Sequence, residues 1–234
     1  MGRIVAIAGG DLETTKALNL YALSMCGKGN KTVLFLGTAS GDDPEYISIF
    51  RAVYKEMGCR VRTLKLTKKT YSTGAIRREV SMADLIYVGG GDTVFMMNVW
   101  KKTGMDVIIK EAYNTDSAVL TGISAGAICW FDSGCTDSES AERPLADNGV
   151  PLPYGIADGM LGFHHYVFCP HYGERTAEFE IIRKMRDKDA IALENNTAFV
   201  EGGGKIYFIS SNAEAKGYVF SDGMKKEIEM RFML

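Results

Sequence analysis

Hydrophobic and polar positions alternate between two kinds of segment over the first half of the chain. Short runs rich in Val, Ile and Leu are followed by longer segments in which apolar residues recur every three or four positions. The runs predict strands at 3–10, 31–39, 60–66, 84–91 and 118–124, and the other segments predict helices at 12–27, 44–58, 72–83, 93–114 and 125–131. Strands of this kind, separated by amphipathic helices, form right-handed βαβ units. The pattern therefore predicts a doubly wound α/β fold: a mostly parallel sheet with helices on both faces.

The pattern changes from about residue 160. A strand-like run ends at Pro170, a helical segment covers 174–188, and short strands follow at 190–194, 197–202, 205–211 and 215–220, separated by Gly and Asn. These strands predict C-terminal β-hairpins, placed at a sheet edge or in a small second sheet. No segment has the composition of a linker, so residues 1–234 are expected to form one domain.

Charge and hydropathy narrow the possible partners and the location. The net charge is -2 and the pI about 6.0, without a basic stripe, so nucleic acid is not an expected partner. No segment approaches the roughly 20 apolar residues that a membrane span needs, and the N-terminal apolar run is too short for a signal peptide. We expect a cytoplasmic protein that does not bind membranes.

Cysteine and glycine patterns argue against bound cofactors. The five cysteines are scattered and form no C-x-x-C pair, so neither a disulfide framework nor a metal site is expected. The glycine-rich turns "AGGDLETT" and "VGGGDT" both depart from G-x-G-x-x-G, so no dinucleotide is expected. The sequence predicts no cofactor.

A serine between two glycines is the first candidate for chemistry. In "GISAG", Gly122 to Gly126, Ser124 lies where a predicted strand ends and a helix begins, which is the setting of a nucleophile elbow. Glycine on both sides would relieve crowding in so sharp a turn. The alternative interpretation makes Ser124 an N-cap, with small neighbours that only let the helix pack on the strand.

A serine nucleophile needs a base and an oriented acid. The chain has three histidines, and His171 follows the end of a predicted strand, the same position that Ser124 has. His164 and His165 lie inside that strand and are expected to be one core and one surface residue. His171 is therefore the predicted base, unless it is only a loop residue.

The candidate acid and the oxyanion hole come from two further strand ends. Glu194 follows the strand "AIAL" and is the predicted acid; Asp137 and Glu139, in the polar loop "DSGCTDSES", compete with it. The N–H of Ala125 would hold an oxyanion, helped by the Gly89–Gly91 turn. That turn is equally explained as a strand-to-helix connection with Asp92 or Thr93 as N-cap.

Together these residues resemble the peptidase E family of aspartyl dipeptidases, which includes the cyanophycinases. The segments "VGGGDT", "GISAGAI", "PHYGERT" and "LENNTAF" occur in the family's order. The resemblance implies a flavodoxin-like, class I glutamine amidotransferase-like architecture and a cytosolic serine hydrolase with a Ser124–His171–Glu194 triad. It also implies an oxyanion hole formed by Gly91 and Ala125. Ile128 and the form of "ALENNTAF" depart from peptidase E and bear on substrate choice.

The predicted function is hydrolysis of a short peptide that begins with an aspartyl residue, through an acyl-enzyme on Ser124. A β-aspartyl or isopeptide-directed hydrolase, an esterase and a non-catalytic binding homologue are the alternatives. Arg175, four positions after His171, is the predicted ligand of the substrate carboxylate, with Arg143 as a weaker candidate. The expected partner is a small peptide substrate, and the protein is expected to be a monomer or a homodimer.

Overall fold

The computed structural model describes residues 2–146 and 148–233. The larger of its two sheets has eight strands in the order β14-β11-β10-β1-β5-β4-β2-β3. Strands β1, β5, β4, β2 and β3 run parallel, whereas β10 is antiparallel to β1 and to β11. The bounds are β1 (Arg3–Ile7), β2 (Thr32–Leu36), β3 (Arg60–Leu64), β4 (Leu85–Val88), β5 (Val119–Ile123), β10 (Thr197–Gly202), β11 (Lys205–Ser210) and β14 (Arg231–Phe232). The predicted doubly wound, mostly parallel sheet is confirmed.

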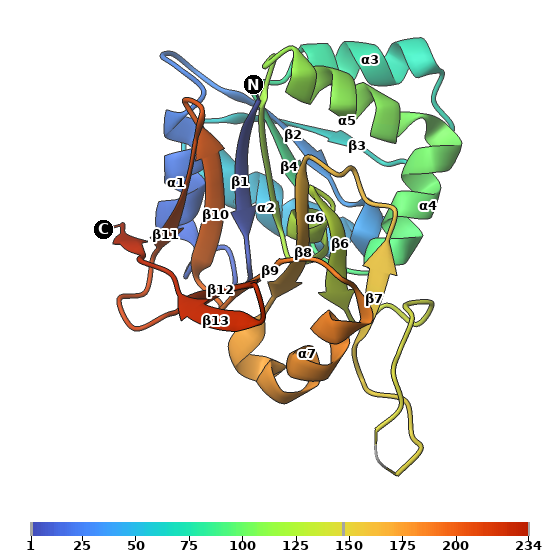
Figure 1. The fold of residues 1–234 in the computed structure, drawn as a ribbon. Helices are drawn as coiled ribbons and strands as arrows, with labels where there is room; N and C mark the ends of the chain where they lie inside the picture. The colour runs from blue at the N-terminus through green and yellow to red at the C-terminus, as the bar shows by residue number, and fades with distance from the viewer. Residues whose placement is uncertain (1, 147, 234) are drawn as a thin grey trace.

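A second sheet of six strands, in the order β13-β12-β9-β8-β6-β7, packs below the first (Figure 1). Its strands are β6 (Phe131–Thr136), β7 (Gly155–Asp158), β8 (His164–Pro170), β9 (Ala190–Leu193), β12 (Gly217–Ser221) and β13 (Met224–Glu227). Both predicted placements of the late strands occur, since β10 and β11 extend the larger sheet whereas β9 and β12 lie in the second. The prediction missed β6, β7, β13 and β14. The β6 sequence "FDSGCT" has little strand propensity, and pairing with β7 and β8 makes it a strand.

The helices follow the predicted segments with two corrections. They are α1 (Lys16–Ser24), α2 (Pro44–Glu56), α3 (Thr73–Ser81), α4 (Thr93–Thr103), α5 (Met105–Asn114), α6 (Ala125–Ile128) and α7 (Thr176–Ile182), with 3-10 turns at Thr38–Ser40, Tyr172–Glu174 and Arg183–Met185. The single helix expected over 93–114 is wrong: Gly104, with φ 73°, is in the left-handed conformation that ends α4. The helix expected over 125–131 ends at Ile128, before β6 begins.

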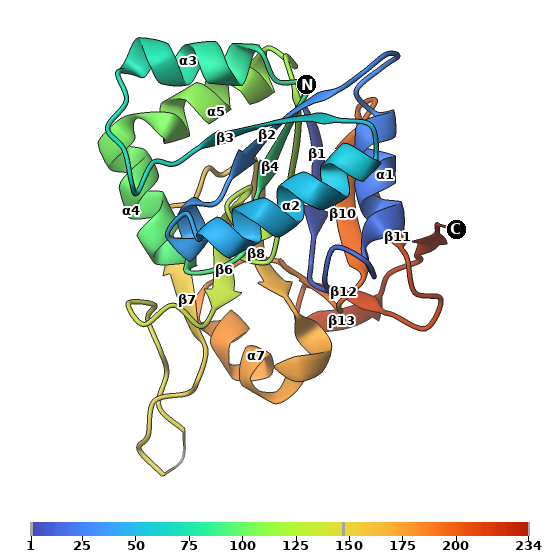
Figure 2. The same ribbon diagram turned by 180° about the vertical axis from the view of Figure 1, so that it is seen from behind.

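Two hydrophobic cores lie on opposite faces of the larger sheet. Alternate residues of β1 point to different cores: Ile4 and Ala6 to the one that contains α4, α5 and α6, and Val5 and Ile7 to the one that contains α1 and α2. Figure 2 shows α1 and α2 across the second of these faces. No helix in the described ranges has the length and hydropathy to cross a membrane.

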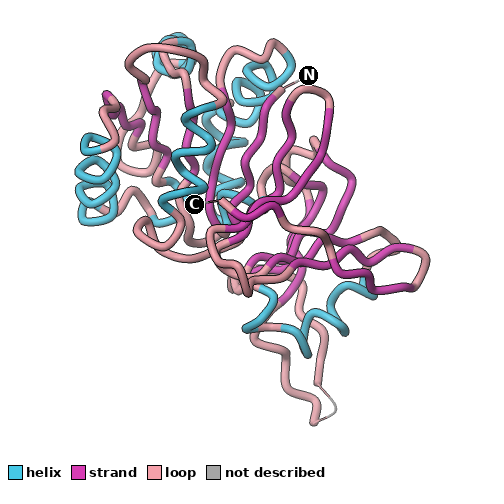
Figure 3. Tube along the Cα trace, turned by 90° about the vertical axis from the view of Figure 1, so that its left-hand side faces the viewer, coloured by secondary structure: helices cyan, strands magenta, loops and turns pink. Residues whose placement is uncertain are grey.

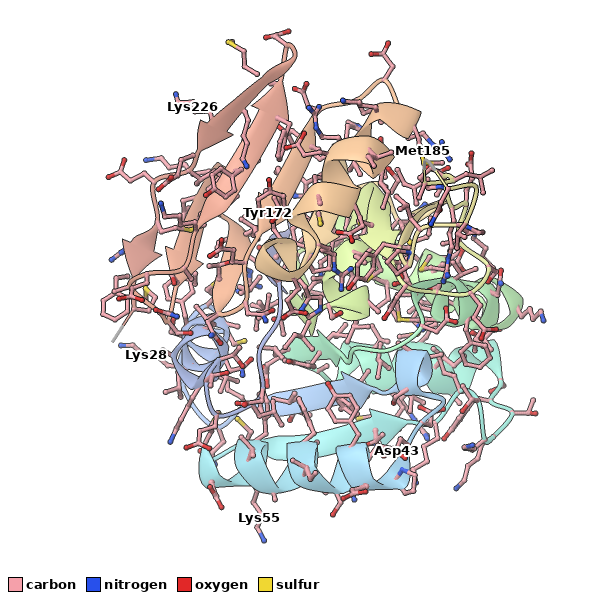
Figure 4. The ribbon with its side chains drawn as sticks, turned by 90° about the horizontal axis from the view of Figure 1, so that it is seen from below. Lys28, Asp43, Lys55, Tyr172, Met185 and Lys226 are labelled. Atoms are coloured by element: carbon pink, nitrogen blue, oxygen red, sulfur yellow. The ribbon has the colours of Figure 1, made fainter. Side chains whose placement is uncertain are left out.

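The carboxyl ends of the parallel strands of both sheets meet at one end of the molecule. Strands β1, β6 and β8 point downward in Figure 1, and Figure 4 looks at that end from below, with Tyr172 near the centre of the view. The connection between β6 and β7 extends from the same end as a long loop, which is clear in the side view of Figure 3. Ligands of doubly wound folds bind beyond the carboxyl ends of the strands, so the site is expected here.

Candidate active site

Ser124 lies on the turn between β5 and α6 with an unfavourable backbone conformation. Its φ is 55° and its ψ -115°, and its N–H donates to the Ile7 carbonyl at 3.1 Å. A Cβ on Gly122 would lie 2.3 Å from the Gly126 carbonyl oxygen, and one on Gly126 would lie 2.1 Å from the Val88 carbonyl oxygen. Only glycine fits at either position. Ser124 holds the N-cap position of α6, but its hydroxyl caps no N–H of that helix within the described residues, so side-chain capping does not explain the serine.

His171 follows β8 and reaches Ser124. Its Nε2 lies 2.6 Å from the Ser124 Oγ, which is a short hydrogen bond. Its φ of 143° is also unusual for a residue with a side chain, and such conformations cost roughly 1–3 kcal/mol each and cluster at functional sites. The other two histidines lie as expected, because His164 is 7% exposed and His165 has an 83% exposed side chain.

Asn195 and Glu174 continue the hydrogen-bond chain from His171. The Nδ1 of His171 lies 2.8 Å from the Asn195 Oδ1, and the Asn195 Nδ2 donates to the Glu174 Oε1 at 2.6 Å. An ionised carboxylate only accepts hydrogen bonds, so Glu174 turns the amide nitrogen of Asn195 toward itself and the amide oxygen toward His171. That oxygen needs a donor, which places the imidazole proton on Nδ1 and leaves Nε2 free to accept the Ser124 proton.

Glu194, the predicted acid, makes hydrogen bonds with Lys216 and none with His171 among the described residues. Its carboxylate accepts from the Lys216 N–H at 2.9 Å, and its own N–H donates to the Lys216 carbonyl at 3.0 Å. Its neighbour Asn195 faces His171 in its place. The competing acids Asp137 and Glu139 are exposed and make no hydrogen bond to His171 within the described residues. Sequence reasoning missed Asn195 and Glu174, although both lie inside the motifs "LENNTAF" and "PHYGERT".

Gly9, two residues beyond the end of β1, packs directly on the bond between His171 and Asn195. A Cβ on Gly9 would lie 2.0 Å from the Asn195 Oδ1 and 2.3 Å from the His171 Nδ1. The Gly9 carbonyl also accepts from the Asn196 N–H at 2.8 Å, which holds the β9–β10 turn against β1. Gly9 therefore lets the backbone approach this hydrogen bond closely, a role that sequence reasoning also missed.

The surroundings of His171 keep it neutral at neutral pH. Burial lowers its pKa from 6.5, and the positive charge of Arg175 lowers it further. The hydrogen bond with Asn195 and the carboxylates of Glu174 and Asp137 act in the opposite direction and do not cancel this effect. A neutral imidazole is the form that accepts a proton from a serine hydroxyl.

The two N–H groups predicted to form the oxyanion hole belong to Ala125 and to the glycine turn at Gly91. Neither the Ala125 N–H nor the Gly91 N–H donates a hydrogen bond within the described residues. The glycine turn reaches Ser124 through Gly90, where a Cβ would lie 3.5 Å from the Ser124 Cβ. The same turn also begins α4, since the Asp92 side chain accepts from the Phe95 N–H. Both interpretations of this glycine run are therefore compatible with the fold.

A cavity of about 330 Å³ opens at Ser124 and His171. It is otherwise lined by Gly10, Asp11, Leu12, Tyr46, Ile49, Tyr87, Gly90 and Ile123. Within residues 2–146 and 148–233, no three His, Cys, Asp or Glu side chains are grouped so that they could hold a metal ion.

The two arginines considered for substrate binding lie outside this cavity. Arg175 is only 6% exposed; its Nη1 donates to the Cys135 carbonyl at 3.3 Å, and its guanidinium lies 4.4 Å from the centre of the Tyr154 ring. Arg143 donates to the carbonyls of Asp137 and Ser138, within its own loop. Arg175 influences the site through its charge on His171.

Comparison with known proteins identifies the family. The model of peptidase family S51 matches residues 4–209. The uncharacterized peptidase YgaJ of Bacillus subtilis is 33% identical over 226 residues, which cover 93% of this chain and 91% of that protein. The crystal structure of a peptidase from an acI-B1 actinobacterium has a similar fold, with a TM-score of 0.74, 19% identity, and coverage of 98% of this chain and 95% of that one.

A second solved structure shares the fold over most of its length. It is that of a Listeria monocytogenes protein provisionally named peptidase E, with a TM-score of 0.62, 21% identity, and coverage of 89% of this chain and 98% of that one. The family match includes strands of both sheets, ends before β12, and covers the segments that carry Ser124 and His171. The chain therefore belongs to peptidase family S51 and is a serine-type peptidase.

Proposed function

We propose that this chain hydrolyses short peptides through an acyl-enzyme on Ser124, with His171 as general base and then general acid. The observation that carries the proposal is the 2.6 Å hydrogen bond between His171 Nε2 and Ser124 Oγ, made by two residues with positive φ. Strained residues that meet in this way are typical of an active site.

In the first half-reaction, the Ser124 Oγ attacks the scissile carbonyl carbon as its proton passes to His171 Nε2. The carbonyl oxygen becomes an oxyanion held by the N–H groups of Ala125 and Gly91. His171 then donates its proton to the leaving amine, the C–N bond breaks, and an ester of Ser124 remains. In the second half-reaction, His171 takes a proton from water and the hydroxide attacks the ester carbonyl carbon. The bond from that carbon to the Ser124 Oγ then breaks, the acid product leaves, and His171 returns the proton to Ser124.

In this scheme Asn195 and Glu174 position His171. Asn195 fixes the tautomer and the ring orientation, and Glu174 fixes the amide of Asn195. An amide stabilises an imidazolium less than a carboxylate does, because it carries no net charge. The triad acid that the resemblance implies, Glu194, has no part in this scheme.

The aspartyl preference implied by the resemblance stays a prediction. Its one structural support is the buried guanidinium of Arg175, whose Nε has no partner within the described residues. The side chain is nevertheless engaged with Cys135 and Tyr154, and it is not part of the cavity wall at Ser124. We therefore propose peptidase activity without an aspartyl requirement.

A serine-directed fluorophosphonate probe tests the proposed function. The native chain should be labelled at Ser124 and should hydrolyse dipeptides, whereas Ser124→Ala should do neither. A well-folded native chain that is not labelled, and that hydrolyses neither peptides nor activated esters, would identify a binding homologue. Hydrolysis of isoaspartyl peptides or of esters alone would assign the same residues to one of the other activities considered above.

A further inference from the structure

The cavity beside Ser124 has an apolar wall. The wall is formed by three aliphatic side chains: Leu12 from the turn after β1, Ile49 from α2, and Ile123 from the end of β5. Ile49 is 51% exposed, although it is a large aliphatic residue. An exposed aliphatic side chain at the mouth of a concave site is available to contact a bound ligand.

The polar groups of this wall are uncharged except at its rim. The Tyr87 hydroxyl is buried without a hydrogen-bond partner in the described part of the chain, and the Tyr46 hydroxyl accepts from the Gly90 N–H at 3.4 Å. Among the described residues, no Lys or Arg lines the cavity. A buried carboxylate needs a cation or several donors, and one free hydroxyl supplies neither.

Asp11 places a negative charge at the rim. Its Oδ1 accepts from the N–H groups of Glu13 and Thr14, which fixes the side chain, and its Oδ2 has no hydrogen bond within the described residues. The backbone hydrogen bond from Thr14 lowers its pKa, so the group is ionised at neutral pH. An acidic substrate side chain in this cavity would face Asp11 without a compensating cation, whereas a peptide ammonium group would be attracted.

We infer that this cavity binds an uncharged, largely apolar side chain of the substrate's N-terminal residue, while Asp11 pairs with that residue's free ammonium group. The inference rests on the proposed function, since it assigns the cavity to the acyl side of the peptide that Ser124 attacks. Such a cavity favours an N-terminal substrate residue such as leucine or methionine over aspartate.

The primary test compares kcat/KM for Leu-X, Met-X, Asp-X and Lys-X dipeptides with one common X. A filled apolar pocket discriminates by about 10- to 200-fold per group, so Leu-X or Met-X should exceed Asp-X by at least about tenfold. Acetylation of the N-terminus of Leu-X should lower kcat/KM, and Asp11→Asn should reduce the difference between the free and acetylated peptides. Asparagine keeps the oxygen that accepts from Glu13 and Thr14, so the loop should remain intact.

Ile49→Arg supplies the missing cation. This variant should raise the Asp-X to Leu-X ratio of kcat/KM by about tenfold or more, the effect of one added charge pair in a partly buried site. Val107→Arg is the matched control, because Val107 is also 51% exposed and lies on α5, away from the cavity. It should leave the ratio unchanged.

A binding measurement separates this inference from the proposed function. Calorimetry with Ser124→Ala should give a lower Kd for Leu-X than for Asp-X, whether or not the native chain turns over. An active enzyme that prefers Asp-X, or a Ser124→Ala protein that binds Asp-X more tightly, would overturn the inference and leave the peptidase proposal intact. A native chain that binds Leu-X preferentially but is neither labelled nor active would overturn the proposed function alone.

Discussion

Replacing Asn195 tests how the base is positioned. Asn195→Ala removes the acceptor 2.8 Å from His171 Nδ1 and leaves the Ser124–His171 pair in place. General acid–base catalysis contributes typically 10²- to 10⁴-fold, and a misdirected imidazole loses most of that contribution. We expect kcat/KM to fall by about 10²- to 10³-fold, equivalent to roughly 2.7 to 4 kcal/mol of transition-state stabilisation at 1.36 kcal/mol per factor of ten.

The effect on stability should be much smaller. A hydrogen bond contributes roughly 0.5–1.5 kcal/mol to folding, so Asn195→Ala should lose about this much free energy of unfolding. The two effects are separable by steady-state kinetics on the best dipeptide and by urea denaturation of the same samples. A loss of activity that merely followed a loss of folded protein would not meet the prediction.

Glu194→Gln is the control for Asn195→Ala, since it changes the neighbouring residue, whose carboxylate binds the Lys216 N–H. Its side-chain amide oxygen can still accept that hydrogen bond, so kcat/KM should change by less than about threefold, a surface-type effect. If Glu194→Gln were as damaging as His171→Ala while Asn195→Ala had little effect, the positioning chain described here would be refuted and the triad implied by the resemblance restored.

Three further predictions follow from the same geometry. Gly9→Ala should lower kcat by at least about tenfold, because the alanine methyl group would overlap the His171–Asn195 hydrogen bond and general-base catalysis contributes 10²-fold or more. Unchanged kinetics in a folded variant would contradict the close approach at Gly9. The acid limb of kcat/KM should have its midpoint below pH 6.5, because the lowered pKa of His171 keeps this base neutral at more acidic pH. Asn195→Asp should move that limb to higher pH, because the added negative charge favours the imidazolium. A pH profile in which Asn195→Asp moves the limb to lower pH would show that another group titrates. Arg175→Met should also move the acid limb to higher pH, since it removes a positive charge near His171, and the shift should be equal for Asp-X and Leu-X. A loss of kcat/KM confined to Asp-X would instead support Arg175 as the ligand of the substrate carboxylate.

The sequence predicts the scaffold well where hydrophobic periodicity is strong. The strands from β1 to β5 and the helices between them lie where continuous apolar runs and amphipathic segments predict them. The errors occur where tertiary contacts override local signals. β6 is short of apolar residues and depends on its partners β7 and β8, and the break at Gly104 depends on one left-handed residue inside a continuous helical pattern.

The sequence predicts which strand ends contribute to the site, but it does not always predict which residue at a strand end does so. Ser124 and His171 follow strands whose carboxyl ends meet, so their proximity was inferable from topology. After β9 the prediction chose Glu194, and the next residue, Asn195, is the one that faces His171. Neighbouring residues at a strand end point in different directions, and the conformation of the turn, which the sequence does not specify, decides which one enters the site.

The most direct test of the account is to map and time fluorophosphonate labelling in the native chain and in His171→Ala. Peptide mass spectrometry should locate the adduct on Ser124 alone, and the labelling rate at neutral pH should fall by about 10²-fold or more in His171→Ala, the contribution expected of a general base. Labelling at another residue, or an equal rate in the two proteins, would contradict the claim that His171 activates Ser124.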